Sequence, residues 1–341
     1  MNSTERVYAA QEGRPVDRPP VFPQIGDHAG ILAGLTYDVM YRDAEKAAEA
    51  HLAALRRYGF DVVTIQVEPS WPVSEACGST VAYPPDKNPW VTDFAVKNDE
   101  DVDRITVPDF MATQSTRVLI EGTRILAERA GVPVVAFMTG PLTFGLQLMP
   151  YEQVMKKIGR DPEFVHRLVR KSVDVIVAYG QALKEAGATI FAICEHDVQM
   201  MSPRHIREFS LRYLPEVLSV YDYNVLHMCG DVNPHLDANA AQFAALDGLN
   251  AISVGPEVDI ARLRRLLGGK IGVAGNIDHL ALLPLGTPAE IEAAVHAAIA
   301  ASEGDPRFIV APGCEITSDT PAPNVEAFVA AARTYAGAAI K

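Results

Sequence analysis

Short runs of β-branched and other apolar residues alternate along the chain with longer stretches in which apolar positions recur every three to four residues. The first pattern is typical of buried strands and the second of amphipathic helices. Predicted strands cover residues 19–25, 61–67, 132–138, 188–193, 225–227, 249–254, 270–274 and 307–311. Predicted helices cover residues 44–58, 114–130, two segments of 151–186 that meet at 159–162, 202–221, 233–245, 259–267, 287–303 and 324–336.

Eight strands that alternate with helices favour a closed parallel barrel. We therefore predict an α/β fold, a single (β/α)8 TIM barrel in which residues 1–341 form one domain. A doubly wound open sheet is the alternative architecture. Residues 69–110 have little periodicity and many turn residues, so we predict an irregular insertion after the second strand, at the barrel rim, with a small hairpin near 78–83.

Composition and charge exclude several classes of partner. Hydrophobic residues make up 48% of the 341 residues, which is enough for one large core. The net charge of −13 disfavours nucleic acid and anionic membranes as partners, because both would be repelled. Residues 1–19 lack an apolar signal segment, and the four cysteines are too sparse for a disulfide framework. We expect a cytoplasmic protein whose cysteines are free to bind a metal.

Polar residues at the C-terminal ends of the predicted strands are the candidates for chemistry, because barrel active sites lie at that face. His227 and Cys229 are two residues apart on an extended segment and therefore point to the same side. Cys314 follows the last predicted strand. Two sulfurs and one imidazole nitrogen suit zinc and leave a fourth position for a substrate. The alternative is that all three are ordinary buried residues that bind no metal.

Four other strand-end positions carry further predictions. Glu195 is a candidate fourth zinc ligand or general base, and the alternative is a rim carboxylate paired with Arg204. The alternation of the fourth strand predicts that Cys194 lies in the barrel wall while Glu195 faces the site. His28 is a candidate for orienting a substrate, with a solvated loop histidine as the alternative. Asp27 is a candidate catalytic carboxylate.

Asn276 and Asp278 follow the seventh predicted strand and are candidates for contact with a cofactor. The alternative role for both side chains is to hold the strand-end loop in place.

The segments 275–278, 286–291 and 308–325 resemble the uroporphyrinogen decarboxylase superfamily. This resemblance covers nearly the whole chain and implies a (β/α)8 barrel. Decarboxylases of that superfamily carry an arginine-rich motif at the end of the first strand, which clamps substrate carboxylates. The corresponding residues 23–28 are Pro-Gln-Ile-Gly-Asp-His in this chain. The missing guanidinium groups make porphyrin decarboxylation the less favoured activity.

The His-x-Cys pair with a distant cysteine is instead similar to the zinc motif of the cobamide-dependent methyltransferase branch, and it matches at His227, Cys229 and Cys314. The resemblance implies a zinc-dependent enzyme that moves a methyl group between a corrinoid protein and a small-molecule donor or acceptor, with zinc activating the substrate. The chain has no corrinoid-binding Asp-x-His-x-x-Gly run. We therefore expect the corrinoid to arrive on a partner protein.

Two functions of other kinds stay open at this stage. The first is a decarboxylase-type lyase with Asp27 or Glu68 in place of the missing arginines. The second is a non-catalytic protein that senses zinc or delivers a corrinoid. The sequence also leaves open the direction of methyl transfer, the donor and acceptor, and the oligomeric state, for which a homodimer is one alternative.

Overall fold

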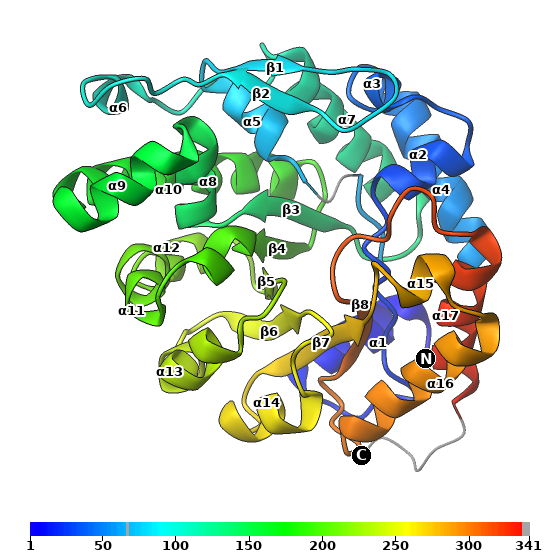
Figure 1. Cartoon of the computed structure of the whole chain (residues 1–341). Helices are drawn as coiled ribbons and strands as arrows, with labels where there is room; N and C mark the ends of the chain where they lie inside the picture. The colour runs from blue at the N-terminus through cyan, green and yellow to red at the C-terminus, as the bar shows by residue number, and fades with distance from the viewer. Residues whose placement is uncertain (66–67, 336–341) are drawn as a thin grey trace.

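The computed structural model describes residues 1–65 and 68–335 and contains a curved sheet of six parallel strands with helices around its outer face (Figure 1). The strands pair in chain order, as expected for successive β/α units. They lie within three residues of the predicted boundaries, as β3 (Val135–Thr139), β4 (Ile190–Cys194), β5 (Asn224–Met228), β6 (Leu249–Val254), β7 (Gly272–Ile277) and β8 (Ile309–Pro312).

Two extended segments continue this sheet at the positions of the first two predicted strands. Val21 forms a parallel bridge with Val310 of β8, and Val63 forms one with Val134, which precedes β3. The Asp61 N–H donates a hydrogen bond of 3.1 Å to the Val21 carbonyl and so joins the two segments. Each segment is thus held by single bridges instead of a regular ladder. Residues 66–67, the predicted end of the second strand, lie outside the described residues.

Helices cover the outside of the sheet because parallel strands need crossover connections. The long helix α10 packs against β3, and α16 packs against β7 and β8 (Figure 1). No helix in the described part of the chain is both long and apolar enough to cross a membrane. The helices that follow the strand segments are α4 (Ala44–Tyr58), α7 (Gln114–Arg129), α8 (Pro141–Leu148), α9 (Tyr151–Arg160), α10 (Pro162–Glu185), α13 (Asn233–Phe243), α14 (Ile260–Leu266), α15 (Leu282–Leu285), α16 (Pro288–Ala301) and α17 (Ala322–Thr334).

The predicted helix 202–221 is broken into three pieces. It consists of α11 (Pro203–Ile206), a π-helical turn at Arg207–Leu211 and α12 (Leu214–Leu218), preceded by a 3-10 helix at His196–Met200. By contrast, the predicted junction at 159–162 is confirmed, because the Asp161 side chain accepts from the Phe164 N–H and Pro162 is the first residue of α10.

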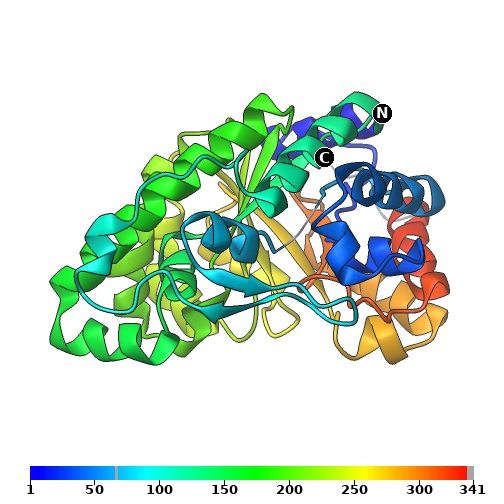
Figure 2. The same cartoon turned by 90° about the horizontal axis from the view of Figure 1, so that it is seen from above.

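Residues 69–110 are more regular than predicted. They form α5 (Ser70–Ala76), an antiparallel hairpin of β1 (Thr80–Ala82) and β2 (Trp90–Asp93), and α6 (Asp101–Arg104). The hairpin packs against α5 (Figure 2). The prediction near 78–83 located only the first strand, because the polar, proline-rich connection 83–89 hides the partner.

Helix α1 (Ser3–Glu12) was not predicted, and it covers the N-terminal ends of the barrel strands. Asn2 and Glu5 form a capping box that starts the helix. Val7 and Gln11 face the strand starts, where a small apolar space separates them from Val135 and neighbouring interior residues. Two further short helices, α2 (Asp27–Leu32) and α3 (Tyr37–Met40), follow the first extended segment.

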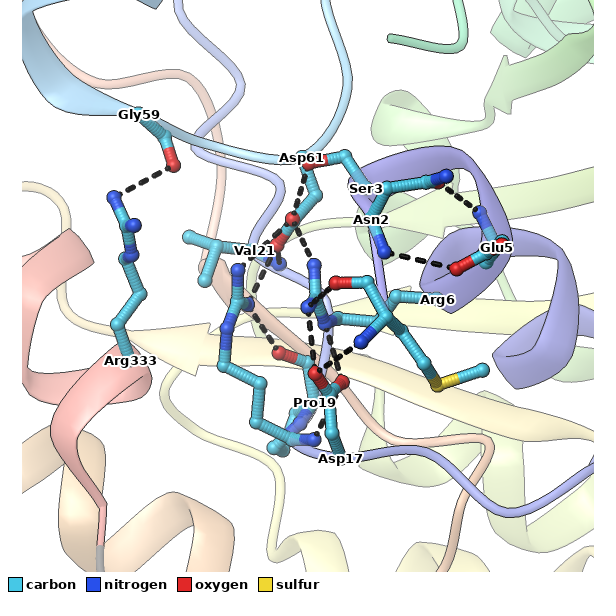
Figure 3. A network of polar contacts seen from close by, with 12 residues as sticks. Asn2, Ser3, Glu5, Arg6, Asp17, Pro19, Val21, Gly59, Asp61 and Arg333 are labelled. Carbon is cyan, nitrogen blue, oxygen red and sulfur yellow. Dashed lines mark hydrogen bonds and ion pairs between the residues drawn. The ribbon is translucent and has the colours of Figure 1, made fainter.

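A buried carboxylate ties α1 to the barrel wall (Figure 3). Asp61 is fully buried and accepts hydrogen bonds from Arg6 Nη1 at 2.8 Å and Arg18 Nη1 at 2.7 Å. It also accepts from Ser3 Oγ at 2.8 Å and from the Val21 N–H at 2.8 Å. A buried charge is tolerated when its lone pairs are matched in this way. This network holds the two bridged segments together where the sheet is least regular.

Candidate metal centre

His227 lies in β5 with its ring fixed by the neighbouring strand. The parallel register pairs His227 with Ser253 of β6, and His227 Nδ1 lies 2.9 Å from Ser253 Oγ. The other ring nitrogen, Nε2, is buried and has no hydrogen-bond partner among the described residues. A buried polar atom without a partner costs free energy unless something binds it. Nε2 is therefore the nitrogen available to a metal ion.

Two cysteines converge on His227 from the ends of two strands. Cys229 follows β5, and Cys314 follows β8 after a single glycine. The nitrogen and the two sulfurs all lie within 4.8 Å of one another. Bond lengths of about 2.3 Å for zinc–sulfur and 2.0 Å for zinc–nitrogen would place the donors of a tetrahedral site roughly 3.5 to 3.8 Å apart. The observed cluster is close to that geometry, and no other His, Cys, Asp or Glu group in residues 1–65 and 68–335 converges in this way.

The thiols of Cys229 and Cys314 affect each other's protonation, and a bound metal would favour the deprotonated form of both. The hydrogen bond between Cys314 and Cys229 lowers the pKa of the Cys229 thiol and raises the pKa of Cys314 to about 12. The pair thus loses one proton readily and the second with difficulty. A divalent cation stabilises both thiolates together. The donor set and the unpaired imidazole nitrogen fit zinc.

The turn after Cys229 depends on a glycine. Gly230 has a φ of 76°, in the left-handed region that favours glycine. A Cβ at this position would lie 2.0 Å from Oε1 of Gln199. A larger residue at position 230 would therefore strain the backbone and displace the end of the Gln199 side chain.

The three donors lie on the wall of a cavity of about 340 Å³ at the C-terminal ends of the strands. This volume suits a small ligand. No lysine or arginine appears among the described residues that line it. The remaining lining residues are Glu68, Trp71, Cys194, His196, Asp197, Gln199 and Glu315.

The structure reverses the predicted orientations of residues 194 and 195. Cys194 lines the cavity, whereas Glu195 is buried outside the cavity lining. The Glu195 carboxylate accepts hydrogen bonds from the N–H groups of Leu142 and Thr143, in the first turn of α8, and from the Ser210 hydroxyl. A helix N-terminus favours such an anion, while burial raises the pKa of Glu195.

Glu195 is therefore positioned to support α8, and its contacts favour neither of the predicted roles. The alternative partner Arg204 is exposed and pairs with Glu208 instead. The prediction was wrong because it assigned the opposite phase to the alternation. Ile190, Ala192 and Cys194 share the inward-facing cluster of the barrel, so Glu195 falls on the outer face with Phe191 and Ile193.

Asp27 and His28 begin α2 and do not line the cavity. His28 is buried, with Nε2 2.9 Å from the Tyr58 hydroxyl, and burial lowers its pKa. Its burial excludes the alternative of a solvated loop histidine, and a role in orienting a substrate stays a prediction. Asp27 is also buried, and its N–H donates to Glu315 Oε1 at 2.8 Å. Burial and the Asp27 carboxylate raise the pKa of Glu315.

Asn276 and Asp278 have contacts that match their alternative role. Asn276 Nδ2 donates to the Val258 carbonyl at 2.6 Å. Asp278 Oδ1 accepts from the N–H groups of Leu280 and Ala281, at 2.9 Å each. Both side chains hold strand-end loops, away from the cavity that contains the metal ligands.

Sequence reasoning did not single out Trp71, His196, Gln199 or Ser253. Trp71 lies in a helix that had been predicted as irregular chain, and His196 and Gln199 lie in the 3-10 helix after β4. Ser253 did carry a signal, because it is a polar residue inside an apolar predicted strand. Its partner could not be identified without the register between β5 and β6.

A barrel with a converging imidazole and two cysteine sulfurs at its C-terminal face defines an enzyme of the (β/α)8 class with a candidate metal site. The chain belongs to the uroporphyrinogen decarboxylase (URO-D) family, whose sequence profile matches residues 2–335.

The similar proteins include enzymes of two kinds. The methylcobamide:CoM methyltransferase MtbA of Methanosarcina mazei is 29% identical over 346 residues, with 97% of both chains covered. The uroporphyrinogen decarboxylase of Chlorobium phaeovibrioides is 26% identical over 312 residues, with 86% of both chains covered. A solved structure described as a methyltransferase from Methanosarcina mazei superposes with a TM-score of 0.88 at 26% identity, covering 99% of this chain and 100% of that one.

The hydrogen bond between His227 Nδ1 and Ser253 Oγ predicts an effect on metal affinity. We expect Ser253→Ala to weaken zinc binding by about 10- to 100-fold, because the His227 ring loses the contact that orients Nε2. Competition with a chromogenic chelator measures this affinity. The control is Ser219→Ala, which removes an exposed hydroxyl that bonds only the Glu216 carbonyl. Equal zinc affinities of the two variants would argue against the orienting role.

Proposed function

We propose that the protein is a zinc-dependent methyltransferase that moves a methyl group between a corrinoid on a partner protein and a small molecule. The observation that carries this proposal is the convergence of His227 Nε2, Cys229 and Cys314 on one cavity wall, with Nε2 buried and unpaired. The names of similar proteins support it, because methylcobamide:CoM methyltransferases from Methanosarcina match this chain over nearly its full length.

His227, Cys229 and Cys314 would hold the ion. When bound, zinc supplies a Lewis acid that favours the deprotonated form of a thiol or polarises the heteroatom of a methyl donor. Ser253 keeps the imidazole ring oriented through Nδ1. Three protein ligands leave a coordination position for a substrate atom, and the cavity provides the space for it.

The size of the cavity supports a corrinoid supplied from outside. A volume of about 340 Å³ accommodates a small molecule. A corrinoid macrocycle with its side chains is several times larger, so it would have to approach at the cavity mouth. Trp71 of α5 lines the cavity, which supports a role for part of segment 69–110 in contact with an approaching partner.

The lyase alternative is less well supported. Uroporphyrinogen decarboxylases are also similar to this chain, but the described cavity lining contains carboxylates and no lysine or arginine. A substrate with several carboxylates would therefore be repelled where it needs cationic partners. A measurement of methyl transfer also distinguishes an enzyme from a non-catalytic protein that senses zinc or delivers a corrinoid.

We expect about one zinc per chain in freshly purified protein, and transfer of the methyl group from methylcobalamin to a small thiol. Elemental analysis gives the zinc content, and the change in the cobalamin absorbance spectrum gives the rate. Treatment with a chelator should remove both the zinc and the activity, and added zinc should restore them. A metal-free preparation with full activity would disprove the proposal.

A further inference from the structure

We infer that the small molecule entering the metal-centre cavity is an organic cation, a protonated amine or quaternary ammonium compound of a few heavy atoms. The inference rests on the proposed function and specifies the charge of its small-molecule substrate. The cavity has a buried polar atom in its lining that is available for binding. His227 lines the cavity and is 3% exposed, and its Nε2 has no partner among the described residues.

Two carboxylates and one imidazole form the wall beside this nitrogen. His196 Nδ1 lies 3.7 Å from Glu68 Oε2, and His196 Nε2 lies 3.7 Å from Asp197 Oδ2. The side chains of Glu68 and Asp197 are only 20% and 21% exposed. Glu68 is also fixed in place, because its Oε1 accepts from the Ser70 N–H at 2.8 Å. Glu68 is therefore held on one side of the imidazole, and Asp197 lies on the other.

The negative charge of this wall exceeds what its neighbours neutralise. His196 is the partner of both carboxylates in the ion pairs of the described residues, so one carboxylate charge remains even when the imidazole is protonated. A zinc ion bound by two thiolates and a neutral imidazole has no net charge and leaves that excess in place.

A small cation would neutralise the excess negative charge of this wall, whereas an anion would add to it. An ammonium group close to a half-buried carboxylate gains more than it would in bulk water, because screening by solvent is weaker there. Trp71 contributes an indole to the same lining, and aromatic faces also attract cations. A carboxylate, sulfonate or phosphate would meet the same groups with the opposite sign, since no lysine or arginine lines the described cavity.

The test uses three two-carbon thiols that differ mainly in charge: cysteamine (positive), 2-mercaptoethanol (neutral) and 2-mercaptoethanesulfonate (negative). Their dissociation constants for the zinc-loaded protein are measured by calorimetry at pH 7, and their methyl-transfer rates with methylcobalamin are measured in parallel. We expect cysteamine to bind at least about tenfold more tightly than the sulfonate, a difference of about 1.4 kcal/mol. Equal affinities, preference for the sulfonate, or no binding of any thiol would overturn the inference.

Variants that remove charge distinguish the effect of the carboxylate wall on binding from the intrinsic chemistry of each thiol. In the double variant Glu68→Gln and Asp197→Asn, the affinity for cysteamine should fall and the affinity for the sulfonate should rise. The ratio of these two affinities should therefore approach one. The control is Glu292→Gln, which removes an exposed carboxylate of α16 outside the cavity lining, and the ratio should keep its original value. An unchanged ratio in the double variant would contradict the inference.

Failure of this inference can be distinguished from failure of the proposed function. If cysteamine binds selectively but no thiol is methylated, the proposed methyl transfer is wrong and the charge preference stands. If methyl transfer proceeds best with the sulfonate, the proposed function stands and the cationic substrate is wrong.

Discussion

Cys314→Ser should lose its zinc and its methyl-transfer activity while the barrel stays folded. Serine offers a hard, weakly acidic oxygen in place of a soft thiolate, and two remaining ligands hold the ion poorly. An open site contributes less to folding than a closed structural one, so the protein should survive the loss. We expect a drop in transfer rate of at least about 10³-fold, which corresponds to losing the several kcal/mol that a Lewis acid supplies.

Zinc content and melting temperature measured on one preparation decide between the ligand role and a packing role. Full zinc with a lowered melting temperature would show that Cys314 is a packing residue, whose replacement costs about 1 to 2 kcal/mol. His227→Ala should behave like Cys314→Ser, and failure of that variant to fold would indicate a structural metal. Cys77→Ser is the matched control. Cys77 is a free cysteine outside the cavity, so this variant should keep its zinc.

Asp61→Ala should lower the free energy of unfolding by about 3 to 5 kcal/mol, the largest stability effect we expect from a single substitution. The substitution leaves Arg6 and Arg18 without the acceptor that both share, and it removes the acceptor of the Val21 N–H. Unpaired buried groups keep their full desolvation cost. Urea unfolding followed by circular dichroism and tryptophan fluorescence measures the change.

Asp103→Ala is the control for this experiment. Asp103 also pairs with an arginine, Arg167, but the two side chains are 62% and 48% exposed. Exposed ion pairs contribute about 0 to 1 kcal/mol. If Asp61→Ala were no more destabilising than Asp103→Ala, the buried network would not be holding the barrel wall.

The strand pattern and the candidate ligands could be predicted because each depends on local sequence. β5 and β8 are short apolar runs that end in a polar residue or glycine, and in a barrel those ends meet at one face. His227, Cys229 and Cys314 could therefore be grouped without coordinates. The grouping agrees with the observed convergence of their ligand atoms.

Other features depend on where one segment meets another, and the sequence contains little information about that. The direction of Glu195 is set by the space over Gly140, where a Cβ would lie 2.4 Å from the glutamate Cδ. Ser253 acts on His227 through the register of two strands. Helix α1 was missed because its inner face includes polar residues such as Arg6 and Gln11, which are buried by tertiary contacts.

The irregular part of the ring has a consequence for how this scaffold can change during evolution. The candidate metal ligands lie in or directly after β5 and β8, which pair regularly with their neighbours, so a shift of register would move all three. Glu68 follows the bridged segment around Val63, which is joined to its neighbours by single bridges and by the Asp61 side chain. The wall that carries Glu68 can therefore change its side chains with less effect on strand pairing than the segments that carry the candidate metal ligands.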